Sequence, residues 1–200
     1  MISAFVILLD FSNATCEINL RRRPTAGILI PALPQCVNVS GKHKERHRHN
    51  KRKNMTNELL RHAVATIDYR FQKSIANSNE TFGGFKIGKD TRTPTEIVNH
   101  MFDLLRKTKI FITEGRFDNI APTRLDFNSE IERFHLELSN LDNAFSKNEL
   151  DITYSKRLLQ GPLSDVMCHI GQISMLSGLN GNRIQAEDYS SAIISPGNFN

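Results

Sequence analysis

Tryptophan is absent from the sequence, and its 200 residues hold only three Cys and three Tyr. The longest largely apolar run, Met1–Leu9, is far shorter than the roughly 20 residues that a membrane-spanning helix needs. No segment alternates apolar and polar residues for long, as a half-buried strand would. The Cys residues, at positions 16, 36 and 168, give no disulfide framework, which suits a reducing compartment. We therefore expect a cytoplasmic protein that does not enter a membrane.

The charge is distributed unevenly along the chain. In total, 26 Lys and Arg stand against 21 Asp and Glu, a net charge of +5, which by itself suggests a nucleic-acid or acidic partner. Residues 1–54 hold 10 basic and 3 acidic residues, a net charge of +7, whereas residues 55–200 hold 16 and 18, a net charge of −2. The basicity therefore belongs to one end of the chain.

A strongly basic block, Lys42–Lys53, accounts for most of that charge. It holds seven Lys and Arg, three His and one Glu, so it repels itself and has no apolar surface to bury. We expect residues 1–54 to be a disordered basic extension, and the folded domain to occupy residues 55–200. Met55 is followed by Thr56, a good helix N-cap residue, and we hypothesise that the native protein starts at Met55.

Two functions are open to the basic block. It is either a solvated linker, which we favour, or a tether for nucleic acid, the only part of the chain to which we assign that partner. A variant of the second function is a metal-gathering cluster formed by His43, His47 and His49.

Apolar residues recur at helical spacing in four segments of the domain. The predicted helices span about residues 57–76, 94–115, 128–145, and 161 to 176 or 179. Thr93 to Glu96, with the sequence TPTE, gives the clearest start signal, because it combines an N-cap Thr, a Pro at the first helical position and a Glu at the third. Four such helices in one domain predict an all-α, four-helix bundle.

A glycine-rich segment between the first two helices imitates a phosphate-binding loop. Gly83–Asp90 nearly fits the pattern G-x-x-x-x-G-K-[ST], but Asp90 replaces the hydroxyl residue that contacts Mg²⁺. No strand is predicted before the loop, and the next helix starts too late, at Pro94. We therefore predict that this loop does not bind a nucleotide.

Three potential metal ligands fall on the second and fourth helices. His100 lies within the apolar stripe of the second helix, and Asp165 and His169 share one face of the fourth because they are four residues apart. We expect that face to point inward, where a bound divalent metal would compensate the carboxylate. Two His and one carboxylate leave coordination positions open. The alternative is purely structural, since a carboxylate is favoured near a helix start and a core His is usually just hydrogen-bonded.

Other reactive side chains receive structural interpretations. Cys168 neighbours His169 in sequence but points about 100° away around the helix, so we predict a buried, small hydrophobic residue and not a nucleophile. His62 and His135 are predicted to be structural or exposed.

Two segments resemble the DinB/YfiT-like family of metal-binding four-helix bundles. They are residues 93–101 (TPTEIVNHM) and residues 160–173 (QGPLSDVMCHIGQI), and the resemblance covers about residues 57–181. In that family one His comes from the second helix and two ligands come from the last, the second of them before a Gly-Gln pair. His100 and His169 match two of these ligands, and Asp165 stands where many members have His. A branch with Gly-Pro before the site resembles this chain in having Asp there.

The resemblance implies a function as well as a fold. Its characterised members use the metal to activate a low-molecular-weight thiol, and the same site could activate water for hydrolysis. We accordingly expect a metal-dependent enzyme whose site holds Zn²⁺ or Ni²⁺, or less readily Fe²⁺ or Mn²⁺. In such a site Gln172 would support one of the ligands. Relatives also suggest a homodimer. Members of the branch often carry Arg near Ser177, and this chain has none there, which leaves its substrate open. The alternative is a non-catalytic bundle that binds a ligand or protein partner, with metal absent or structural.

Overall fold

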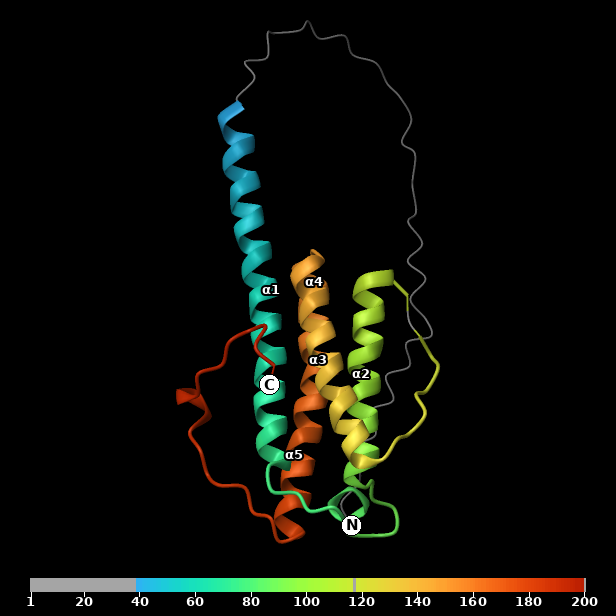
Figure 1. Cartoon of the computed structure of the whole chain (residues 1–200). Helices are drawn as coiled ribbons and strands as arrows, with labels where there is room; N and C mark the ends of the chain where they lie inside the picture. The colour runs from blue at the N-terminus through green and yellow to red at the C-terminus, as the bar shows by residue number, and fades with distance from the viewer. Residues whose placement is uncertain (1–38, 117, 200) are drawn as a thin grey trace, which may run out of the picture. The chain divides into compact units, whose positions relative to one another are not determined.

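The computed structural model describes residues 39–116 and 118–199, and all regular structure in them is helical (Figure 1). The helices are α1 (Val39–Ile75), α2 (Pro94–Glu114), α3 (Phe127–Lys147), α4 (Ile152–Leu158) and α5 (Ser164–Leu179). A π-helical turn, Leu159–Leu163, joins α4 to α5, and short 3₁₀ turns lie at Phe82–Gly84 and Tyr189–Ser191. The predicted all-α class is therefore confirmed for this part of the chain. Among these same residues, no helix has the length and apolar character to cross a bilayer.

The helices α1 and α3 run antiparallel. Arg61, near the middle of α1, forms a two-point ion pair with Asp142 near the end of α3. Two turns later in α1, Asp68 contacts His135, which comes earlier in α3. Contacts that move forward along one helix and backward along the other require opposite directions.

The helices α2 and α3, by contrast, run parallel. Asn99 of α2 donates a hydrogen bond to Glu130 of α3, and further along both helices Lys109 contacts Glu137. Parallel neighbours need a connection that returns to the starting end, and the chain between Gly115 and Asp126 supplies one.

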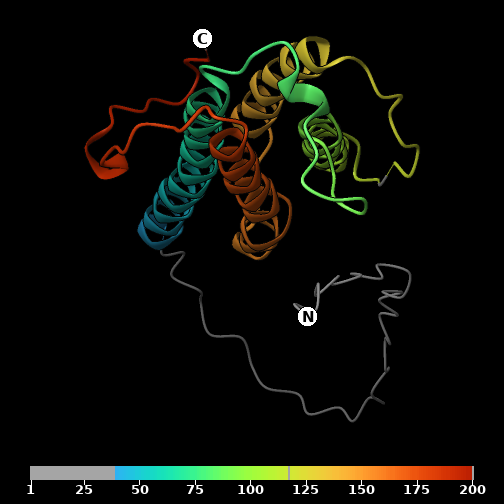
Figure 2. The ribbon, with the colours of Figure 1, turned by 90° about the horizontal axis from the view of Figure 1, so that it is seen from below.

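The long helices share one hydrophobic core. Both α1 and α2 pack against α3 and α5, an arrangement that can be followed end-on in Figure 2. Phe71 of α1 and Phe134 of α3 are fully buried and meet edge to face, with their ring centroids 4.6 Å apart. Burying one such side chain contributes about 1.5–3 kcal/mol. The same core includes Met101 of α2 and Ile170 of α5, so it fixes these two helices against each other as well.

The predicted start of α2 is confirmed in detail. The Thr93 hydroxyl accepts a hydrogen bond from the Glu96 amide at 3.2 Å, and the Glu96 carboxylate accepts one from the Thr93 amide at 2.8 Å. This reciprocal arrangement satisfies two amide groups that have no partner within the helix. The helix ends at Gly115, whose φ of 67° is the left-handed conformation that favours glycine.

The first helix starts earlier than predicted. The structure begins α1 at Val39, so the boundary predicted between residues 54 and 55 is not a helix boundary, and the basic block Lys42–Lys53 lies on the helix. Lys and Arg have high helix propensity, so a helix fixed by the core can continue through a basic block. Residues 1–38, the rest of the predicted extension, lie outside the described chain.

The fourth predicted helix also starts earlier, at Ile152 instead of Gly161. Asp151 caps it by accepting hydrogen bonds from the amides of Thr153 and Tyr154. Pro162, which follows the predicted start at Gly161, lies inside the π-helical turn. Proline lacks the amide hydrogen that a regular helix needs at this position, and a π-helical turn accommodates the defect.

The glycine-rich segment has a structural role. It starts within a 3₁₀ turn that follows the helix α1. This agrees with the prediction that the segment before it is not a strand. A Cβ atom at Gly83 would lie 2.5 Å from Cβ of Phe127, so only glycine fits between α2 and α3 there. The Thr95 hydroxyl donates to the Gly83 carbonyl at 2.8 Å and fixes the loop against the start of α2.

Candidate metal centre

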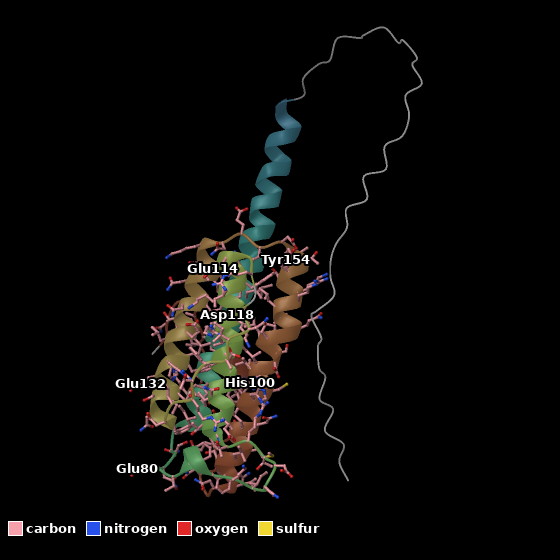
Figure 3. All side chains as sticks on the ribbon, turned by 90° about the vertical axis from the view of Figure 1, so that its right-hand side faces the viewer. Glu80, His100, Glu114, Asp118, Glu132 and Tyr154 are labelled. Atoms are coloured by element: carbon pink, nitrogen blue, oxygen red, sulfur yellow. The ribbon has the colours of Figure 1, made fainter. Side chains whose placement is uncertain are left out.

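Two helices bring the three predicted ligands together. His100 lies in the second turn of α2, and Asp165 and His169 lie one turn apart at the start of α5. One potential ligand atom from each residue falls within 4.8 Å of the others. Figure 3 labels His100 where α2 faces the other helices. The juxtaposition that the sequence spacing predicted is therefore present.

The two imidazoles face one carboxylate. Nε2 of His100 lies 3.7 Å from one oxygen of Asp165, and Nε2 of His169 lies 3.5 Å from the other. The two rings meet nearly at right angles, with their centroids 4.8 Å apart. Nitrogen and oxygen donors thus converge on a single small volume.

Gln172 controls the orientation of His169. Its side-chain oxygen lies 2.8 Å from Nδ1 of His169, and an amide oxygen can only accept a hydrogen bond. The proton of a neutral His169 is therefore on Nδ1, and the lone pair of Nε2 is directed toward Asp165 and His100. Hydrogen bonds of this kind fix the ring and raise its basicity as a ligand, which is the role predicted for Gln172.

The backbone at both histidines is fixed by buried neighbours. Ile97 and Met101 of α2 are almost completely buried next to His100. Val166 and Ile170 do the same for His169 on α5. A shift of either helix would open a void in the core, and each such void costs several kcal/mol.

Burial decreases across the three residues. The exposed fraction of the side chain is 10% for His169, 33% for His100 and 48% for Asp165. The expectation that this face points inward is right for His169 and wrong for Asp165. A four-residue spacing places two side chains on one side of a helix, but their depth depends on the neighbouring helix, which spacing does not reveal. Water can therefore reach the group from the side of Asp165.

Burial also affects the protonation of His100. Its pKa is lowered from the usual imidazole value, chiefly by desolvation, and further by the electrostatic effects of the neighbouring His169 and of the positively charged Arg92. Asp165 and Asp103 oppose this shift without cancelling it. A lowered pKa keeps His100 neutral at neutral pH, which is the form that can bind a metal ion.

The sequence reasoning missed Arg92 and misplaced Cys168. Arg92 is exposed, lies one residue before the N-cap of α2, and acts electrostatically on His100. Its position next to the predicted N-cap is the signal by which the sequence could have placed its charge near His100. Cys168 is exposed and not buried as predicted, because it lies off the side of α5 that carries the buried residues Val166 and Ile170.

The remaining histidines do not join the group. His62 is exposed, and His135 lies on α3 with Nδ1 2.7 Å from a carboxylate oxygen of Asp68, so both agree with their predicted structural or surface roles. The side chains of His43, His47 and His49 lie outside the described residues.

A His–Asp–His donor set with one solvent-accessible side is suited to binding a metal ion. It can hold a divalent ion through three protein atoms and leave positions for water or a substrate atom. The same three residues without an ion would form only weak, partly exposed ion pairs.

Comparisons of the chain with family models, with curated proteins and with solved structures gave no match.

Proposed function

We propose that this chain is a metal-dependent enzyme of the DinB/YfiT-like kind. In this proposal it is a four-helix bundle that binds a divalent metal through His100, Asp165 and His169, and acts on a small molecule with an activated thiol or water. The reaction is a transfer or a hydrolysis. Zn²⁺ and Ni²⁺ suit two imidazoles and one carboxylate best, and Fe²⁺ and Mn²⁺ are also compatible.

One observation carries the proposal. His100 comes from a helix 65 residues earlier in the sequence than Asp165, and yet the donor atoms of all three residues lie within 4.8 Å. The imidazole of His169 is held by Gln172 with its free nitrogen toward the other two. A structural hydrogen-bond network would pair these groups closely, whereas here the nitrogen–oxygen separations are 3.5 and 3.7 Å.

These separations fit a metal ion. Nitrogen and oxygen ligands bind Zn²⁺ at about 2.0–2.2 Å, and so two ligands at a tetrahedral angle lie about 3.3 Å apart. Both separations are slightly longer than this value and too long for good hydrogen bonds. A small movement of the exposed Asp165 side chain would complete the set.

Each residue would have its own role at such a site. A bound divalent metal would stabilise a thiolate or lower the pKa of water at the open position. His100 and His169 supply neutral donors, Asp165 supplies a negative charge that reduces the net charge of the centre, and Gln172 keeps His169 oriented. Arg92 adds a positive charge near His100, which favours a substrate with an anionic group.

The alternative is a non-catalytic bundle that binds a ligand or partner. The exposure of Asp165 favours this alternative, because water alone can satisfy a carboxylate of which 48% is exposed. In that case any metal would be structural or absent.

Metal content tests the proposal directly. Protein prepared without an affinity tag and analysed by elemental analysis is expected to hold about one divalent metal per chain. His100→Ala and His169→Ala should abolish it, while His62→Ala, a matched change at an exposed His on α1, should leave it unchanged. Replacing His43, His47 and His49 by Asn should also retain it. A wild-type protein that binds no metal would contradict the proposal.

Turnover separates the enzyme from the structural alternative. The metal-loaded protein is assayed with a panel of low-molecular-weight thiols and activated esters, with His100→Ala as the blank. Metal-dependent turnover is expected, and a loaded protein that is inactive with every acceptor favours a structural metal.

A further inference from the structure

A second site lies at the other end of α5, away from the histidines. A cavity of about 640 Å³, open to solvent on one side, is bounded by the last turns of α1 and α5 and by the segment that follows α5. Its apolar lining residues are Ala76, Ile184 and Ala186, and its polar lining residues are Lys73, Asn77, Ser177, Asn182, Arg183, Gln185 and Glu187. Small-molecule sites typically occupy about 300–1,000 Å³.

The cavity is separate from the candidate metal centre. None of its lining residues is His100, Asp165, His169 or Gln172. Ser177 follows His169 by eight residues on α5, which corresponds to about 12 Å along the helix axis. A ligand in this cavity would therefore not replace a metal ligand.

The outer wall of the cavity is held in place by ionic and aromatic contacts. Glu187 accepts a hydrogen bond from the hydroxyl of Tyr69 with one oxygen and pairs with Lys73 Nζ at 3.1 Å with the other. Two residues later, the ring of Tyr189 lies 4.0 Å from the guanidinium of Arg70. The segment after α5 is thus attached to α1, and it forms one wall of the open cavity.

Two polar side chains at the lining are not available to a ligand. Nδ2 of Asn182 has no hydrogen-bond partner within the described residues, but it is buried too deeply for a molecule in the open cavity to reach it. The hydroxyl of Ser177 is already used, since it donates to the Asn182 carbonyl at 3.0 Å.

The charges in the lining are also unbalanced. Lys73 and Arg183 are cationic, and Glu187 is the single carboxylate among the lining residues. Both oxygens of Glu187 are engaged by Tyr69 and Lys73, so they are not available to Arg183. In the described part of the chain, Arg183 has no salt bridge.

We propose that this cavity binds a small anion that presents a phosphate or carboxylate group to Arg183 and Lys73. Ala76, Ile184 and Ala186 contact the uncharged part of the same ligand. Phosphate and carboxylate share the charge and the acceptor geometry that a guanidinium recognises.

Binding of two probes to the full chain tests this site. Inorganic phosphate and citrate are titrated separately and followed by calorimetry and by amide shifts in NMR spectra. At least one should bind saturably and shift the amides of Asn182 and Arg183. The probe that binds more tightly identifies the source of the anionic group.

Matched variants locate the binding. Arg183→Gln should weaken it about tenfold or more, because it removes a charge-assisted hydrogen bond. Arg157→Gln, which makes the same change at an exposed position of α4, should leave it within about twofold. Ala76→Phe keeps every charge, narrows the cavity and should also weaken binding.

Three outcomes would overturn the site. They are the absence of saturable binding by either probe, an equal loss in Arg183→Gln and Arg157→Gln, and a loss of binding in His100→Ala. The last outcome would assign the anion to the metal centre. Since the cavity shares no residue with that centre, anion binding is independent of whether the proposed metal is found.

Discussion

At the scale of single residues, His169 is the best-defined group of the candidate metal centre. Its side chain is nearly buried, Gln172 fixes the proton on Nδ1, and Nε2 is directed toward Asp165. The affinity for a metal should therefore depend on a residue that is not itself a ligand.

Gln172→Leu is expected to weaken metal binding about 10–100-fold, because the imidazole loses the acceptor that orients it. Competition with a chromophoric chelator measures this affinity. Met175→Leu, an exposed change one turn further along α5, is the control and should have no effect. Equal affinities in wild type and Gln172→Leu would show that Gln172 has no supporting role.

Single residues also show which features of the site could be predicted from the sequence and which could not. The identities of His100, Asp165 and His169 followed from helical spacing and a family resemblance, and the structure brings the three together. The exposure of Asp165 and Cys168 did not follow, because it depends on which side of α5 the other helices cover. Periodicity along one helix does not contain that information.

At the scale of elements, the start of α2 was predictable because its signals are local. Thr93, Pro94 and Glu96 are consecutive or nearly so, and their hydrogen bonds need no other helix. The start of α5 was not predictable, because Pro162 is also compatible with a π-helical turn that continues from a helix beginning at Ile152. The start of α1 was missed because a charged composition does not distinguish a solvated helix from disorder.

Glu96→Gln tests the cap of α2 through pH. The hydrogen bond from the Thr93 amide, helped by the charge of Arg124, lowers the pKa of Glu96 below its usual range. The stabilisation by the ionised form is therefore present above the usual carboxyl pKa and is lost as the pH falls through the lowered one. Glu96→Gln should cost about 0.5–1 kcal/mol at neutral pH, allowing for solvent screening.

Thermal unfolding across pH 2 to about 7 measures this difference, which should vanish at the acid end. Glu132→Gln, an exposed carboxylate on α3, is the control. A difference between wild type and Glu96→Gln that stays constant with pH would contradict the role of the ionised cap.

The contact between α1 and α3 depends on the ion pair of Arg61 and Asp142. The side chain of Asp142 is 5% exposed, and both of its oxygens accept from Arg61, at 2.8 and 2.9 Å. Arg61→Met should cost about 3 kcal/mol, because it leaves a buried carboxylate without its partner. Urea unfolding measures the loss.

Two further variants separate the cost of an unpaired buried charge from the cost of lost packing. The double variant Arg61→Met/Asp142→Leu should recover much of the stability, since no unpaired charge remains. Arg116→Met, which removes an exposed ion pair with Glu114, should cost less than about 0.5 kcal/mol. A double variant as unstable as Arg61→Met would show that the cost is due to lost packing.

At the scale of the whole molecule, the net positive charge and the two candidate sites lie in different parts of the chain. The net charge of +7 lies in residues 1–54, and the candidate metal centre and the cavity lie in residues 55–200, which carry −2. The pI of about 9.2 therefore describes neither part.

Any salt-sensitive binding of DNA is predicted to reside in the basic block of α1. Replacing Arg46, Arg48, Lys51 and Arg52 by Gln should abolish it, because such binding arises from released counterions. Fluorescence anisotropy at 50 and 200 mM salt measures it. Neutralising Lys89, Lys147, Lys156 and Arg157 in the domain is the matched control, and an equal loss there would assign the binding to the domain.

The order of the helices has a consequence for how the molecule folds. His100 and His169 are 69 residues apart in sequence, and the long connection after α2, the helix α3 and the helix α4 lie between them. Bringing their nitrogens together requires the closure of a large loop, whose entropic cost only the finished core can offset. The proposed metal binding should therefore be a late event in folding, and a coloured metal ion such as Co²⁺ should acquire its spectrum only in the slowest refolding phase.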